Sequence, residues 1–222
     1  SHGLGIGDIS DATAPALFGS YITPDAANDV QVVGNIAYVG ADEEAGLQVI
    51  DISNPAAPTL LGAWVRADND ARAVQVVGST AYVVAGRALL VMDVSTPAVP
   101  SLPGYYAMYQ LDGLPHAVQV EGSIAYIAAA EEGLKVVDVS TPTTPTLLGS
   151  FVTDDDAYDV QVEGNTAYVT AGRAGLQIVD VSTPAAPTLL GSFDLGGFAW
   201  GVHVVGSTAY VAVYDGGLHI ID

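Results

Sequence analysis

Short runs of alternating apolar and polar residues, separated by turn residues, recur along the whole chain. In one copy the runs are residues 160–162, 166–170, 175–181 and 188–193, with Gly, Pro, Asn or Ser between them. β-Branched and aromatic residues dominate these runs, and no stretch keeps the 3.6-residue spacing of an amphipathic helix. The pattern therefore predicts four consecutive β-strands in each copy, which we number first to fourth.

The copies repeat at a nearly constant interval. The tyrosine of an A-Y-[VI] triplet marks each of them, and these tyrosines are Tyr38, Tyr82, Tyr126, Tyr168 and Tyr210. A period of about 40–45 residues with four short strands is typical of a β-propeller that has one blade per repeat. We predict an all-β, five-bladed β-propeller of four-stranded antiparallel blades, forming one domain over residues 1–222. The expected blades are residues 29–66, 73–108, 117–153, 159–195, and 201–222 completed by 15–22.

The first and last copies are incomplete, which raises the question of how the ring closes. The first-strand and fourth-strand sequences each occur five times, whereas the third-strand sequence occurs six times, because residues 3–8 and 217–222 both match it. We expect residues 15–22 to pair with the C-terminal blade as its fourth strand and residues 3–8 to be displaced. A monomer closed in this way is favoured, and a strand-swapped dimer is the alternative.

Two repeated residue types have structural interpretations. We expect the tyrosine of each A-Y-[VI] triplet to pack between adjacent blades. An aspartate ends each third strand, two residues before a serine. Its carboxylate can accept hydrogen bonds from backbone N–H groups in the following turn. These aspartates are Asp51, Asp93, Asp138 and Asp180. A catalytic acid is needed once, so recurrence in every blade favours the turn role.

The segments GLQVIDISNPAAPTLLG, GLKVVDVSTPTTPTLLG and GLQIVDVSTPAAPTLLG resemble the LVIVD repeat. The resemblance covers nearly the whole chain, although the second copy has Ala88 where the others have glycine. It implies a β-propeller of the kind found in bacterial, often secreted or surface-associated proteins. It implies no activity, since the family shares no catalytic motif. The near-identity of the copies and the incomplete outer copies favour a fragment or an engineered form of a larger repeat protein.

Composition narrows the classes of partner. The net charge is −20 with only five Lys and Arg, so the chain lacks the cations that bind phosphate backbones or anionic membranes. No apolar stretch approaches the ~20 residues of a membrane span. The absence of cysteine excludes disulfides and thiolate sites. We therefore expect no nucleic acid and no membrane span, and the partner is an unknown ligand or protein at an acidic surface.

Most acidic residues fall in the loops after the second and fourth strands, which lie on one face of a propeller. One interpretation of this acidic top face is that its charge only keeps the protein soluble. The other is that the face binds a cation or a basic partner. Residues 67–70 and 154–156 supply oxygen ligands of the kind Ca²⁺ prefers, without the spacing of an EF-hand. Ca²⁺ is therefore the single cofactor candidate, and no metal site is predicted.

Two sets of side chains are candidates for function. Polar residues at matching places in the first strands predict a channel ring that satisfies itself with trapped water, or receives a ligand. This ring comprises Gln31, Gln75, Gln119, Gln161 and His203. The tentative binding residues of the top face are Asp29, Asp68, Asp70, His116, Asp155, Tyr158, Asp159 and Trp200, with Phe198, Tyr109 and Trp64 extending the aromatic rim. Aromatic faces beside carboxylates suit a sugar or an organic cation.

The sequence thus favours a non-enzymatic binding or scaffold β-propeller. A cation-dependent or sugar-binding surface protein that uses the acidic face is one alternative. The other is a hydrolase-type enzyme at the channel mouth, for which Asp29, Asp159, His116 and His203 are the acid–base candidates. We predict no catalytic site, because nucleophile motifs and phosphate-binding loops are missing from the sequence.

Overall fold

All regular secondary structure in the computed structural model is β-strand. The structure describes residues 3–42, 44–66, 70–108 and 114–222, and they contain 21 strands and no helix. The chain divides into two compact units, residues 1–86 with 90–103 and residues 87–89 with 104–222. Each is described by itself below. Among the described residues, no helix has the length and apolar character that crossing a bilayer requires.

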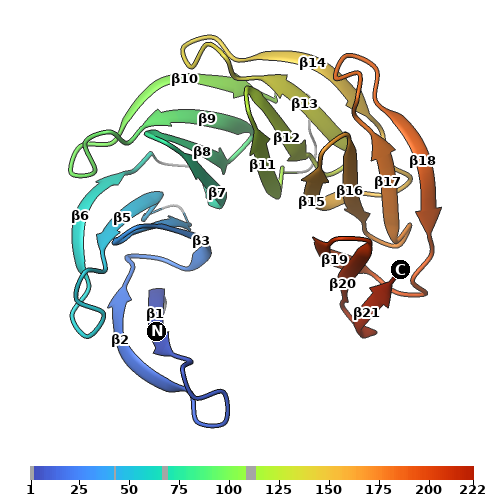
Figure 1. Cartoon of the computed structure of the whole chain (residues 1–222). Helices are drawn as coiled ribbons and strands as arrows, with labels where there is room; N and C mark the ends of the chain where they lie inside the picture. Colours follow the sequence, from blue (N-terminus) through green and yellow to red (C-terminus); the bar gives the residue numbers. More distant parts are fainter. Residues whose placement is uncertain (1–2, 43, 67–69, 109–113) are drawn as a thin grey trace. The chain divides into compact units, whose positions relative to one another are not determined.

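Four repeats form complete antiparallel sheets of four strands (Figure 1). Blade 1 contains β3 (Ala27–Val33), β4 (Ile36–Ala41), β5 (Leu47–Asp51) and β6 (Thr59–Trp64). Blade 2 contains β7 (Ala71–Val77), β8 (Thr80–Ala85), β9 (Ala88–Asp93) and β10 (Ser101–Ala107). Blade 3 contains β11 (Ala117–Glu121), β12 (Ile124–Ala128), β13 (Leu134–Asp138) and β14 (Thr146–Phe151). Blade 4 contains β15 (Ala157–Glu163), β16 (Thr166–Ala171), β17 (Leu176–Asp180) and β18 (Thr188–Phe193).

The remaining strands belong to the two ends of the chain. A hairpin joins β1 (Gly3–Asp8) to β2 (Ala16–Ile22), and a three-stranded C-terminal sheet contains β19 (Ala199–Val205), β20 (Thr208–Val213) and β21 (Gly217–Ile221). The all-β, five-bladed β-propeller fold that the sequence predicts is confirmed.

The strand pairing at the ends differs from the expected closure. Strand β2 pairs with β1, from Gly3 opposite Ile22 to Asp8 opposite Ala16, and not with the C-terminal sheet. Residues 3–8 are therefore not displaced. The physical reason is local: β1 matches the same third-strand pattern as β21, and closing the short loop between β1 and β2 costs little chain entropy.

Two of the repeated tyrosines are seen to pack between blades, as the sequence predicts. In the second unit, Tyr126 of blade 3 shares one apolar cluster with Val160 and Val169 of blade 4. Tyr168 of blade 4 packs in the same way against the cluster of the C-terminal sheet. Each tyrosine thus extends the buried surface of its own blade onto the next one.

A glycine at the same place in the fourth strands of blades 1 to 3 allows each strand to approach the following blade. A Cβ on Gly149 would lie 2.5 Å from the Pro184 carbonyl oxygen, in the turn between the third and fourth strands of blade 4. Gly62 faces the corresponding backbone at Ala98, and Gly104 the one at Pro142. The close approach leaves no room for a side chain, so this glycine is a packing requirement between blades.

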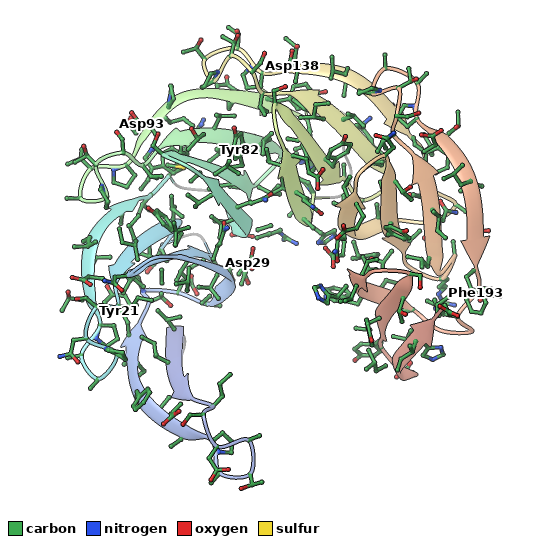
Figure 2. The ribbon with its side chains drawn as sticks, in the orientation of Figure 1. Tyr21, Asp29, Tyr82, Asp93, Asp138 and Phe193 are labelled. Atoms are coloured by element: carbon green, nitrogen blue, oxygen red, sulfur yellow. The ribbon has the colours of Figure 1, made fainter. Side chains whose placement is uncertain are left out.

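The aspartates that end the third strands hold the next turn. The carboxylates of Asp51, Asp93, Asp138 and Asp180 each accept a 2.8 Å hydrogen bond from the backbone N–H of the serine two residues later. Asp93 and Asp138 are labelled in Figure 2, at the turns that follow β9 and β13. The backbone and hydroxyl hydrogen bonds from Ser140 lower the pKa of Asp138 below its usual value. The turn role predicted from recurrence is confirmed.

Acid is expected to weaken these turns together. Each of the four carboxyl pKa values is lower in the folded chain than in the unfolded one, so these groups stabilise the fold fully above the unfolded pKa of about 4. This stabilisation falls as the pH drops through the lowered values. Urea unfolding at a series of pH values from about 6 downward should show the loss. Asp138→Asn keeps an acceptor oxygen and removes the titration, so an acid dependence as steep as that of the parent would contradict this origin.

Candidate functional site

The glutamines predicted to line a channel bind the backbone of the next blade. In the second unit, the Gln161 side chain accepts a hydrogen bond from Val204 N (2.7 Å) and donates one to Val204 O (3.0 Å). Gln119 makes the same pair of bonds with Val162, at 2.6 and 3.1 Å. In the first unit, Gln31 bonds both backbone groups of Val76. The prediction that these amides satisfy one another with trapped water is therefore wrong for Gln31, Gln119 and Gln161.

The other two members of that predicted ring differ from these three. Gln75 occupies the matching place on β7 and is also engaged with a partner. His203 occupies this place on β19 and is exposed. Gln31, Gln119 and Gln161 are thus blade-to-blade clamps, in which one side-chain amide satisfies both the N–H and the C=O of a residue in the next blade.

Two predicted acidic binding residues are also structural. Asp159 accepts hydrogen bonds from Val160 N (2.8 Å) through one carboxylate oxygen and from Val202 N (2.9 Å) through the other. Asp29 bonds Val30 N and Val74 N in the same way. Figure 2 labels Asp29 at the beginning of β3. Because both oxygens of each carboxylate are engaged, these residues join blades and are poor candidates for acid–base chemistry.

The position ten residues before each A-Y-[VI] tyrosine, which precedes Asp29 and Asp159 in blades 1 and 4, changes from blade to blade. It is occupied in turn by Asn28, Arg72, His116, Tyr158 and Trp200. In the first unit its contacts are polar: Asn28 donates to Asp42 at 2.7 Å, and Arg72 lies 3.6 Å from Asp70. In the second unit the three residues are aromatic. A position that varies within an otherwise repeated sequence is the expected place for function.

Four ring side chains of the second unit form one continuous cluster, which we call the aromatic row: His116, Tyr158, Trp200 and Phe198. The His116 and Tyr158 rings stack with centroids 4.7 Å apart, and Tyr158 stacks on Trp200 at 4.9 Å. Phe198 meets Tyr158 edge to face at 4.9 Å. The row residues lie on or just before strands β11, β15 and β19, and these strands lie side by side (Figure 1). Trp200 remains 55% exposed and presents aromatic surface to solvent.

The carboxylates beside the row are mostly occupied. Asp155 accepts a bond from Arg173 N at 2.8 Å, and Asp154 accepts one from the buried Gln177 amide at 2.6 Å. Burial, followed by the charges of Asp156 and Asp155, raises the pKa of the Tyr158 hydroxyl. The carboxylates of this loop are thus mostly engaged within the fold, and burial together with their charge favours the neutral form of the Tyr158 hydroxyl.

A cavity of about 360 Å³ opens beside Phe198. It is lined by Arg173, Asp194, Gly196, Gly197, Phe198 and Asp215. Arg173 lies in the loop after β16, Asp215 in the loop after β20, and the other four between β18 and β19. Sequence reasoning missed Arg173, Asp194 and Asp215 as a group. Its one available signal was that all three occupy the loops that it assigned to the top face.

The remaining sequence predictions concern Asp68, Tyr109, Trp64 and a metal site. Asp68 and Tyr109 lie outside the described residues. Trp64 ends β6 in blade 1, in the unit that does not carry the row. Across residues 3–42, 44–66, 70–108 and 114–222, no three His, Asp or Glu side chains are grouped as a metal site would require.

Comparison with known proteins identifies the repeat. The LVIVD repeat model matches six consecutive segments: residues 1–23, 25–64, 68–108, 112–153, 154–195 and 196–222. The chain belongs to the LVIVD repeat family. The glutamine clamps, the interblade glycines and the turn aspartates thus all lie within LVIVD repeats. No curated protein matches the chain.

Solved structures similar to this LVIVD-repeat chain share its fold at low sequence identity. The computationally designed Ika8 protein is 15% identical with a TM-score of 0.75, over 92% of this chain and 61% of the designed one. The β-propeller domain of Cps50 (Swd1) from Myceliophteria thermophila is 10% identical with a TM-score of 0.72, over 90% and 72% of the two chains. A functionally unknown protein from Desulfotomaculum acetoxidans DSM 771 is 14% identical, also with a TM-score of 0.72, over 93% and 72%. At these identities the likeness concerns the fold alone.

Proposed function

We propose that this LVIVD-repeat chain is a non-enzymatic binding module whose ligand docks on the aromatic row. One observation carries the proposal: three aromatic side chains at the same repeat position of successive blades stack at 4.7 and 4.9 Å. The blades themselves do not need this stack, because blades 1 and 2 have Asn28 and Arg72 at that position. Exposed aromatic surface at a site that packing does not explain is typical of a recognition surface.

The alternatives receive less support. The hypothesis of a hydrolase-type enzyme relies on Asp29 and Asp159. Their carboxylates accept hydrogen bonds from backbone N–H groups of the next blade. The cation alternative relies on residues 67–70, of which 67–69 lie outside the described residues, and on residues 154–156. In the second segment Asp154 and Asp155 accept hydrogen bonds from the Gln177 side chain and the Arg173 backbone. Groups already satisfied within the fold offer little to a substrate or an ion.

Trp200→Ala is expected to weaken binding of the ligand by roughly tenfold or more, because exposed tryptophans supply much of the energy of such contacts. Titration calorimetry compares the affinity of the parent chain with that of the variant, because its readout does not depend on Trp200 itself. Arrayed neutral glycans, choline and acidic or basic peptides are suitable probes.

The matched control is Tyr105→Ala, which removes an aromatic side chain that is 48% exposed on β10, outside the row. It should leave binding unchanged while circular dichroism shows both variants folded. If no probe binds, or if the two variants affect binding equally, the proposal fails.

A further inference from the structure

The cavity beside Phe198 is held open by hydrogen bonds that do not involve a ligand. Arg173 N donates to Asp155, and Asp194 accepts a 2.8 Å bond from Gly196 N. Across the neighbouring strands, Ala199 N donates to Gly172 O at 2.8 Å and Tyr214 N to Phe198 O at 2.9 Å. The walls are therefore preformed, and binding would cost little conformational entropy.

Glycines bring the backbone close to the cavity wall. A Cβ on Gly172 would lie 2.7 Å from the Asp155 carboxylate and 3.4 Å from the Phe198 ring, and Gly172 has a φ of 45°. A Cβ on Gly197 would lie 2.6 Å from the Val213 side chain. Neither position has space for a side chain. The loops on both sides of Phe198 are thus packed tightly, which fixes where this ring stands between the row and the cavity.

The polar groups of the cavity carry both signs of charge. Asp194 and Asp215 supply carboxylate acceptors, and Arg173 supplies guanidinium donors. Among the described residues, none of these three side chains forms an ion pair within 4.0 Å. The net charge of these three groups is negative, which disfavours an anion. A simple cation would leave the guanidinium donors unused, whereas the hydroxyl groups of a neutral polyol can donate to both carboxylates and accept from the guanidinium.

The cavity and the row are continuous through one residue. Phe198 lines the cavity, and its ring centroid lies 6.0 Å from that of Trp200. Trp200 offers an exposed aromatic face, whose negative quadrupole attracts the weakly positive C–H face of a sugar ring. The surface therefore combines a flat apolar platform with an adjacent pocket for hydroxyl groups.

We infer that the ligand is a neutral oligosaccharide, with one ring stacked on Trp200 and the hydroxyls of the next in the cavity between Arg173 and Asp215. This inference rests on the binding function proposed above. The cavity volume of about 360 Å³ is at the small end of the ~300–1,000 Å³ typical of ligand pockets, which suits one monosaccharide unit. Contact with both parts of the surface requires at least two linked rings.

The experiment is a glycan array of neutral oligosaccharides, followed by titration calorimetry with the best glycan and with choline as a cationic probe. Arg173→Ala and Trp200→Ala should each weaken glycan binding by roughly tenfold or more. Arg87 provides the matched control: it occupies the corresponding G-R-A segment of blade 2 and is also exposed. Arg87→Ala should leave glycan binding unchanged, and thermal melting should show all three variants folded.

The outcomes separate this inference from the proposed function. Binding of choline that needs Trp200 but is unaffected by Arg173→Ala, with no glycan bound at millimolar concentration, overturns the carbohydrate inference and leaves the binding function standing. If neither Arg173→Ala nor Trp200→Ala changes the glycan affinity, both the carbohydrate inference and the proposed binding function are overturned. A glycan affinity reduced by Arg173→Ala and Trp200→Ala, and not by Arg87→Ala, supports both.

Discussion

Replacing Gly149 by alanine is expected to lower the free energy of unfolding by about 1–3 kcal/mol, the usual cost of forcing extra volume into a packed site. The new Cβ would lie 2.5 Å from the Pro184 carbonyl oxygen and 2.8 Å from the Ala185 carbonyl carbon. Both contacts are with backbone, so the strand must move away from blade 4. Urea unfolding, followed by circular dichroism, measures the loss.

Gly191→Ala is the matched control for this prediction. Gly191 lies in β18, whose sequence Thr-Leu-Leu-Gly-Ser-Phe is identical to that of β14, the strand of Gly149. Among the described residues, no atom lies within 4 Å of a Cβ placed on Gly191. Alanine is the better residue in an unobstructed strand by roughly 0.5–1 kcal/mol, so this variant should be neutral or slightly more stable. Equal destabilisation by both variants would show that the glycine serves the strand and not the blade interface.

Replacing Gln161 by leucine is expected to cost about 2–4 kcal/mol. The leucine has a similar size, but it leaves the N–H and C=O of Val204 without their partner, and each stranded buried group costs about 1–3 kcal/mol. Val204 is only 4% exposed, so water replaces the lost bonds poorly. Denaturant unfolding of the purified variant provides the measurement.

Two variants test the cause of that loss. Gln161→Glu keeps an acceptor for Val204 N but places a carboxylate oxygen against Val204 O. Its loss of stability relative to the parent chain at the same pH should therefore shrink as the pH falls and the carboxyl becomes a donor. His203→Ala alters the matching place on β19, where the side chain is exposed, and should change stability little. A His203→Ala variant as unstable as Gln161→Leu would show that this place stabilises its own strand instead of the next blade.

The repeat separates structural positions from the candidate site. Positions that are the same in most copies, such as the clamp glutamines and the glycines of the fourth strands, make contacts between neighbouring blades. The position ten residues before each A-Y-[VI] tyrosine is not repeated, and in the second unit its three residues stack in the aromatic row. Comparing copies within one chain therefore distinguishes residues that build blades from residues available to a ligand.

Part of the candidate site could be predicted from this comparison. His116, Tyr158 and Trp200 stand at the same distance from their repeat markers, so neighbouring blades were expected to bring them together. Asp29 and Asp159 were assigned to the same binding face, and their role as links between blades was missed. The sequence shows a carboxylate near the start of a first strand, but not that one of its oxygens accepts from the next residue and the other from an N–H group more than 40 residues away.

The sequence by itself determined the strands, the blades and the turns, because alternation, a period of 42–44 residues and Asp-x-Ser turns are all local or regularly repeated signals. Only the tertiary structure decided three further features. It paired β2 with β1. The sequence could not decide which strand pairs with β2, because β1 and β21 match the same third-strand pattern. The tertiary structure turned the predicted channel glutamines into clamps, since their partners are backbone groups of another blade. It also joined the row to the cavity at Phe198, because loops from different repeats become neighbours only when blades pack face to face.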